Sequence, residues 1–214
     1  MRTIIKIAIF CLLFYFNNIS GQNFNLGISI GADLTSANNY TKLYYEVEKS
    51  NNLEKESVLN YNLNLIFQKK ISNKFGLIAS PGYIRKGYEL YSEFYSTKWN
   101  YSYINLPLLI QYYLKENISI TLGPEVSYLL KLNVVDKESN FNVRKEDINL
   151  NSFDIALNAG INYDINKKLG FSLNYSHGLI PFFTEYYLDP NFSLIIQSNA
   201  YHQYFQFAAK YFFL

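Results

Sequence analysis

Cysteine is almost absent from this chain, because the 214 residues contain only Cys11. Cys11 lies in an N-terminal segment that we expect to be removed, so the mature protein should have no disulfide, no thiol nucleophile and no cysteine-ligated metal. Histidines number 2, and glycine and proline are sparse at 10 and 5 residues. Beyond the N-terminal segment, no apolar run reaches the ~18 residues of a membrane-spanning helix. The sequence therefore excludes a helical membrane protein and a disulfide-rich secreted domain.

The N-terminal segment has the order of a secretory signal peptide. Arg2 and Lys6 are followed by the apolar run Ile7–Phe16, which is too short to cross a bilayer as a helix, since that takes ~20 residues. We predict a signal peptide at residues 1–21 and a single mature domain at residues 22–214. Removal of the signal would leave 17 of the 19 basic residues against 17 acidic ones. The mature chain is then formally neutral, which gives no electrostatic basis for binding nucleic acid.

The chain does contain a regular alternation of apolar and polar residues. In residues 24–34 every second side chain is apolar, and those between are small or polar, which in a strand makes one apolar and one polar face. We expect eight strands, at about residues 24–34, 60–68, 75–87, 100–114, 117–130, 151–164, 168–179 and 199–213. The third is ambiguous because apolar residues fall on both of its faces. Aromatic residues, 18% of the chain, gather near strand ends, as membrane interfaces favour.

The connections between these strands alternate between short and long. They are short at 71–74, 115–116 and 165–167, and long and polar at 35–57, 88–99, 131–150 and 180–198. This is typical of an all-β fold, the eight-stranded antiparallel up-and-down transmembrane β-barrel of an outer membrane, with both termini periplasmic. The alternative is a soluble barrel such as a lipocalin, whose apolar face points inward. The polar face here is mainly Asn, Ser, Gly and Gln, whereas Lys and Glu dominate the outside of soluble barrels, so we favour the lipid-facing barrel.

Two neighbouring predicted strands carry a family resemblance. Tyr101–Leu114 (YSYINLPLLIQYYL) followed by Ile120–Leu130 (ITLGPEVSYLL) resembles the paired strands of the PorT-type outer-membrane β-barrel family of Bacteroidetes. Further matches, in the same order, are Gly82–Leu90, Phe153–Ile165 and Phe171–Phe182. The resemblance implies contact with outer-membrane lipid and insertion by the barrel-assembly machinery. The family is named for a member tied to protein secretion, but most of its members have no assigned role, so that role is not transferred to this chain.

The polar face would line the barrel interior, which with eight strands is just wide enough to be filled by its own side chains. Candidate members of an interior network are Asp33, Arg85 or its neighbour Lys86, Glu125, Asp154 and Lys210. Buried charges must pair, because an isolated one costs several kcal/mol. Such a network would close the barrel, and the alternative is a pathway for a ligand or for protons. In the hairpin at 100–130 we expect Asn105, Gln111, Thr121 and Glu125 inside, and Ile104 to Leu114 at every second position outside.

The long loops supply the candidate partner contacts, because exposed aromatic side chains are typical binding anchors. These candidates are Tyr44, Tyr45, Tyr95 and Trp99. Catalysis finds little support. The alternation places His177 and His202 near the outer ends of their strands, where an interfacial role is expected. Ser176 precedes His177, but strand neighbours face opposite sides and cannot form a dyad.

We therefore expect no catalytic residue, no cofactor and no metal site. The function predicted is that of a non-enzymatic outer-membrane barrel, structural or partner-binding, within a secretion or envelope assembly. A narrow channel or transporter for small solutes is the alternative. A lipid-modifying outer-membrane enzyme is a weaker one.

Overall fold

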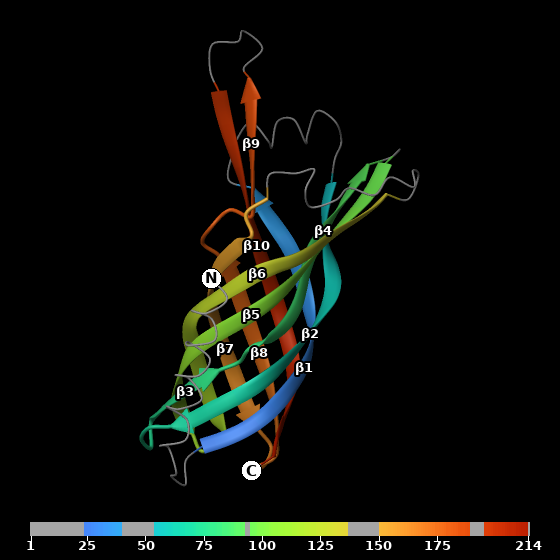
Figure 1. Ribbon diagram of the computed structural model, residues 1–214. Coiled ribbons are helices and arrows are strands. Elements are labelled where there is room, and N and C mark those ends of the chain that lie inside the picture. The colour runs from blue at the N-terminus through green and yellow to red at the C-terminus, as the bar shows by residue number, and fades with distance from the viewer. Residues whose placement is uncertain (1–23, 40–53, 93–94, 137–149, 189–194, 214) are drawn as a thin grey trace, which may run out of the picture.

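The computed structural model describes residues 24–39, 54–92, 95–136, 150–188 and 195–213 (Figure 1). The predicted signal peptide at 1–21 lies outside these residues. The strands are β1 (Phe24–Asn39), β2 (Glu54–Lys70), β3 (Phe75–Ala79), β4 (Gly82–Ser92), β5 (Tyr95–Lys115), β6 (Ile118–Asp136), β7 (Phe153–Asp164), β8 (Leu169–Gly178), β9 (Phe183–Leu188) and β10 (Ile195–Phe212). Within the described ranges, no helix is long and apolar enough to cross a membrane.

The strands close into a ring in which every pairing is antiparallel. The order around the ring is β1, β2, β3 with β4, β5, β6, β7, β8 and β10, and β1 pairs β10 from Gly27↔Phe212 to Asn39↔Ala200. β3 and β4 act as one strand of the ring, because both lie between β2 and β5 and only Ser80 and Pro81 separate them. β9 pairs with the first residues of β10, and these two paired segments project beyond the ring (Figure 1). The ring therefore has eight positions, and the predicted eight-stranded barrel is confirmed.

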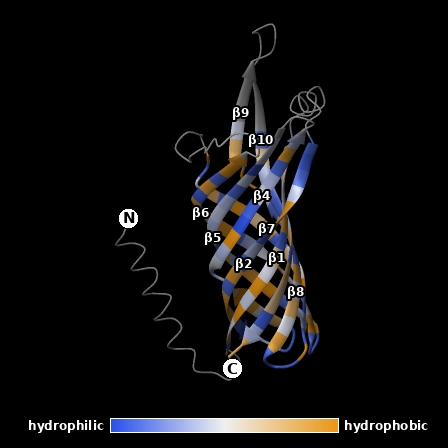
Figure 2. Ribbon diagram, turned by 90° about the vertical axis from the view of Figure 1, so that its right-hand side faces the viewer, coloured by the Kyte–Doolittle hydropathy of each residue, from blue (hydrophilic) through white to orange (hydrophobic). Residues whose placement is uncertain are grey.

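Alternation along each strand separates a polar interior from an apolar exterior. In β6, Thr121, Glu125 and Ser127 are buried, whereas Leu122 and Val126 are exposed. Figure 2 shows the same alternation of apolar and polar residues along the strands. The inward residues predicted for the hairpin at 100–130 are all buried, which confirms that prediction. A soluble barrel would hide its apolar face, so this exterior, covered with exposed Leu, Ile, Val and Phe, fits a barrel that faces lipid.

The ambiguity of the third strand has a structural cause. Ile78 of β3 and Ile84 and Tyr88 of β4 point inward and are buried, although their chemistry is that of the outer face. They belong to two apolar clusters that occupy the two ends of the interior. A strand that feeds both clusters carries apolar residues on both faces, and its sequence pattern is mixed for that reason.

All three short connections, the start of β1 and the end of β10 lie at one end of the barrel, here called the turn end. The turns are closed locally: Ile71 N donates to Phe75 O and Ile165 N to Leu169 O, each at 2.9 Å. Asn166 Oδ1 accepts from Leu169 N at 2.9 Å, which is the local hydrogen bonding that makes Asn a turn residue. The opposite end is called the loop end.

The predicted loops at the loop end are too long. Residues 35–39, 54–57, 88–92, 95–99 and 131–136 continue the strands, and β9 with the start of β10 forms a further hairpin within 180–198. The physical reason is that alternation marks only the part of a strand with one apolar face. Beyond it, both faces of β2 are polar or half-exposed, as in Glu54, Lys55, Glu56 and Ser57, and the pattern no longer indicates a strand.

Candidate functional site in the barrel interior

An ion cluster occupies the middle of the interior. Lys86 Nζ of β4 lies 2.9 Å from Glu125 Oε1 of β6 and 2.8 Å from Asp154 Oδ2 of β7. All three side chains are at most 1% exposed. Their strands occupy separate positions in the ring, and each residue takes an inward position of its strand's alternation. The single cation therefore holds two carboxylates together across the interior.

Polar neighbours surround Glu125 in this ion cluster, whereas Oδ1 of Asp154 is buried without a hydrogen-bond partner. Glu125 Oε1 also accepts from Ser127 Oγ at 3.0 Å, and Glu125 Oε2 accepts from Asn158 Nδ2 at 2.9 Å and from the Tyr204 hydroxyl at 2.5 Å. Lys86 Nζ lies 5.2 Å from the ring centroid of Tyr103 and 5.3 Å from that of Tyr204, at cation–π distance. Glu125 is thus fully hydrogen-bonded, as a buried carboxylate requires.

Aromatic side chains fill the interior on the loop side of the ion cluster. The His202 ring stacks on Phe182 with centroids 3.8 Å apart, and Tyr101 meets both rings edge-on. His202 Nε2 lies 3.0 Å from the Tyr103 hydroxyl. Trp99 stacks on Tyr88 at 6.1 Å. These side chains form one buried apolar cluster with Ile84, Leu129, Leu132 and Val134, and it closes this part of the interior.

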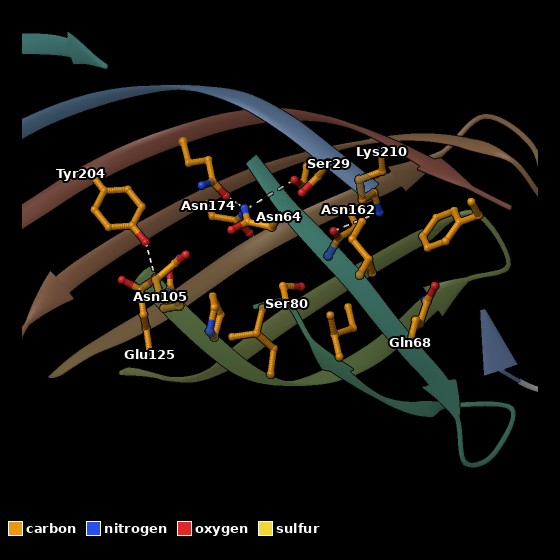
Figure 3. Close-up of a pocket in the computed structure, with 18 residues that line it drawn as sticks. Ser29, Asn64, Gln68, Ser80, Asn105, Glu125, Asn162, Asn174, Tyr204 and Lys210 are labelled. Atoms are coloured by element: carbon orange, nitrogen blue, oxygen red, sulfur yellow. Dashed lines mark hydrogen bonds between the residues drawn. The ribbon is translucent and has the colours of Figure 1, made fainter. Parts of the chain in front are cut away.

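A small polar cavity lies on the turn side of the ion cluster (Figure 3). Its volume is about 50 Å³, and its lining includes Asn64, Asn105, Glu125 and Tyr204. At ~10–15 Å³ per water centre, this is room for a few waters that would hydrogen-bond the amide groups. Ile66, Ile78 and Phe212 form a second apolar cluster toward the turn end.

Further polar contacts close the turn side. Gln68 Nε2 donates to Gln111 Oε1 at 2.8 Å, and Gln111 Nε2 donates to Ser119 Oγ at 2.6 Å. Lys210 Nζ lies 2.9 Å from Asp164 Oδ1 and 3.2 Å from Asn162 Oδ1. The interior thus contains two apolar clusters and two ion-paired groups, with a small polar cavity among them. This arrangement can brace the barrel.

Comparison with known families decides where the chain belongs. Residues 19–184 match the family model described as "Outer membrane protein beta-barrel domain". The chain belongs to this family. It is therefore an outer-membrane β-barrel. No match was found among curated proteins.

Solved structures similar to this outer-membrane barrel share its overall form at low identity. Ail of Yersinia pestis has a TM-score of 0.47 and 15% identity, over 90% of this chain and 100% of Ail. OprG from Pseudomonas aeruginosa has a TM-score of 0.45 and 12% identity, over 89% and 95% of the two chains. Neisserial surface protein A has a TM-score of 0.46 and 10% identity, over 86% and 96%. At this level of similarity no activity transfers from them.

The structure places four of the five candidate charged residues of the barrel inside. Glu125 and Asp154 meet at the ion cluster, and Lys210 pairs with Asp164 nearer the turn end. Asp33 is buried and accepts from Asn62 Nδ2 at 2.8 and 2.9 Å. Of the two alternatives on β4, Lys86 is the one inside and Arg85 is wrong: Ile84, Lys86 and Tyr88 take the inward positions, so Arg85 lies on the outer side of β4. The mixed pattern of this strand hid that phase from the sequence.

The aromatic candidates for loop contacts have different outcomes. Tyr44 and Tyr45 lie outside the described residues, and their assignment stays a prediction. Tyr95 is the first residue of β5, paired with Ser92, rather than part of a long loop. Trp99 is also a β5 residue, and its ring stacks inside against Tyr88, so its assignment as a loop contact is wrong. The strand continues through this region, which turns Trp99 inward.

The histidines of the barrel are placed on opposite faces. Ser176 is 1% exposed and points inside, whereas His177 is only partly buried on the outer face, so the two do not form a dyad, as expected. The interfacial role expected for His202 is wrong, because its ring is buried among Tyr101, Tyr103 and Phe182. Across the parts of the chain that the structure describes, no group of three or more His, Cys, Asp or Glu could hold a metal ion.

Proposed function

We propose that this outer-membrane barrel is a non-enzymatic, partner-binding protein with a closed interior. Its binding surface is the part of the barrel wall that stands beyond the membrane at the loop end, and its turn end and both termini face the periplasm. The observation that carries the proposal is the length of the strands. β5 has 21 residues and β6 has 19, whereas a tilted crossing takes only ~9–11.

The excess length lies at one end only. In β5 the exposed apolar residues run from Ile104 to Leu114, which is already a full crossing, and Lys115 ends the strand directly after them. Residues 95–103 therefore stand beyond this stretch on the loop side. The loop-end parts of β2, β4, β5 and β6 remain paired, from Glu54↔Tyr91 to Thr97↔Asp136. This paired wall, called the extension, offers a surface held by strand pairing.

The outer side of the extension mixes apolar and charged side chains. Tyr91 of β4 is 47% exposed and Val135 of β6 is 46% exposed. Between their strands lies Lys98 of β5, which pairs with Glu89 of β4 on one side and with Val135 on the other. Exposed aromatic and aliphatic anchors with charges around them are typical of protein interfaces.

We propose that the bound partner is a component of a secretion or envelope assembly. During biogenesis the barrel-assembly machinery would be a second, transient partner. Outer-membrane lipid surrounds the exposed apolar exterior of the barrel throughout.

Removing the exposed anchors of the extension should weaken partner binding. We expect the double variant Tyr91→Ala, Val135→Ala to lower recovery of co-purified partners from detergent-solubilised envelopes at least about tenfold, since truncated anchors cost about 1–2 kcal/mol each. The matched control is Val126→Ala, Tyr128→Ala, which removes the same two side-chain types from the lipid-facing part of β6. Equal recovery from both double variants would contradict the proposal.

The closed interior predicts electrical silence. In planar bilayers we expect the full chain to produce no conductance steps, because two apolar clusters and the ion cluster of Lys86, Glu125 and Asp154 fill the route along the barrel axis. A general porin added to the same membrane serves as the positive control. Reproducible small steps that increase in number with the amount of protein would instead favour the narrow channel.

A further inference from the structure

Lysine residues gather at the turn end of the barrel. They are Lys69, Lys70, Lys74, Lys115, Lys167 and Lys168, and this group is called the lysine collar. All are exposed except Lys69, which is half-buried. The described acidic residues at this end are Glu116, which is exposed, and Asp164, which is bound to Lys210. The collar therefore carries a strong net positive charge, although the mature chain as a whole is formally neutral.

The collar is spread around the rim rather than concentrated on one side. Its members lie at the end of β2 and in the turn that follows it, at the end of β5, and in the turn between β7 and β8. These three places are separate around the ring of eight strands. A protein partner would contact one sector of such a rim, whereas the molecules that surround every sector of a membrane barrel are lipids.

The collar also lies at the edge of the exposed apolar exterior of the barrel. Exposed apolar residues stand directly beside it in the chain: Ile71, Phe75, Leu114, Ile165 and Leu169. Lysine buries its aliphatic stem along apolar surface and raises its ammonium group to the polar level of the membrane. The outward members of the collar can therefore place their ammonium groups at the level of lipid phosphates, whereas Lys70 Nζ lies 5.1 Å from the ring centroid of Tyr113.

We propose that the lysine collar binds the anionic headgroups of phospholipids in the leaflet at the turn end. The chemistry is the pairing of ammonium groups with phosphodiester oxygens, reinforced by the negative surface potential of an anionic leaflet. The loop end offers no matching collar in its described part, because Glu54, Glu56 and Glu89 accompany Lys55, Lys98 and Lys131 there. This inference does not depend on partner binding by the extension.

The test compares two spin-labelled lipids around the reconstituted barrel. The full chain is placed in phosphatidylcholine bilayers that contain a trace of labelled phosphatidylglycerol or labelled phosphatidylcholine, and the ratio of their association constants is measured. We expect a ratio above one for the native chain. It should fall about twofold or more in the variant Lys74→Gln, Lys115→Gln, Lys168→Gln, and molar salt should lower it in the native chain by screening.

The control removes three lysines from the loop end, as Lys55→Gln, Lys98→Gln, Lys131→Gln, and should leave the ratio unchanged. A ratio of one for the native chain would overturn the proposal, and so would an equal fall in the control variant. If the collar variant does not fold, the native chain with and without salt decides the question alone. Loss of an acidic protein from co-purification with the collar variant, with a native lipid ratio of one, would replace lipid with a protein as the ligand.

Discussion

Replacing Lys86 with methionine is expected to lower the free energy of unfolding by about 3–5 kcal/mol, the cost of breaking a buried ion pair from one side. The substitution leaves Glu125 and Asp154 close together without a cation, and both are almost completely buried. Methionine keeps most of the volume of the lysine stem, so the loss reports on charge rather than on a cavity. Urea unfolding in micelles measures it, and the temperature at which the barrel loses its fast migration on gels should fall in parallel.

Two further variants give this prediction its controls. Lys131→Met removes an exposed lysine from β6 and should change stability by no more than about 0.5 kcal/mol. The triple variant Lys86→Met, Glu125→Gln, Asp154→Asn removes all three charges and should recover most of the loss, because replacing a whole buried ion group is often close to neutral. If Lys86→Met were as stable as Lys131→Met, the ion cluster would not be a buried brace of the barrel.

Placing arginine at Leu122 should destabilise the barrel in a bilayer by about 2–4 kcal/mol. Leu122 is 55% exposed on the outer face of β6 and pairs with Ile110, which lies near the middle of the exposed apolar residues Ile104 to Leu114 of β5. A guanidinium group there must enter hydrocarbon or deform the bilayer to reach water. Unfolding from phosphatidylcholine vesicles by guanidinium chloride gives the free-energy difference from the native chain.

The matched variant for Leu122→Arg is Leu130→Arg, which makes the same change on the same strand and face. Leu130 is followed by the exposed Lys131, and its position near the interface predicts a cost of only about 0–1 kcal/mol. The two variants should lose equal free energy of unfolding when the chain is unfolded from detergent micelles that leave both positions accessible to water. Equal costs in the bilayer would mean that the exposed belt of β6 does not cross hydrocarbon.

Alternation allowed much of the barrel wall to be predicted, because side-chain direction in a strand is a local property. Residues such as Asn105 and Glu125 take their inward position from the period of two alone. The prediction was wrong where inward positions also hold apolar side chains. Ile78, Ile84 and Tyr88 are apolar yet inward, so the pattern of the third strand does not show which of Arg85 and Lys86 points inside.

Strand length was also underestimated for a local reason. Alternating hydrophobicity records contact with lipid on one face, and it stops where β4 and β5 leave the membrane. Their backbones stay paired, as in Tyr88↔Trp99, and this pairing depends on the neighbouring strand rather than on side-chain hydropathy. The sequence predicts a loop contact for Trp99 and an interfacial role for His202. Both predictions are wrong because no local pattern shows that aromatic residues also fill the interior at the loop end.

The sequence by itself determined the class of the protein: eight alternating strands, a polar interior, an apolar belt and short turns at one end. Each of these follows from residues close together in the chain. Only the tertiary structure decided which charges meet. Lys86 is 39 residues from Glu125 and 68 from Asp154, and Tyr204 is 79 from Glu125. Their contact depends on ring closure and on the register of each strand pair, which together bring distant strands to face one another across the interior.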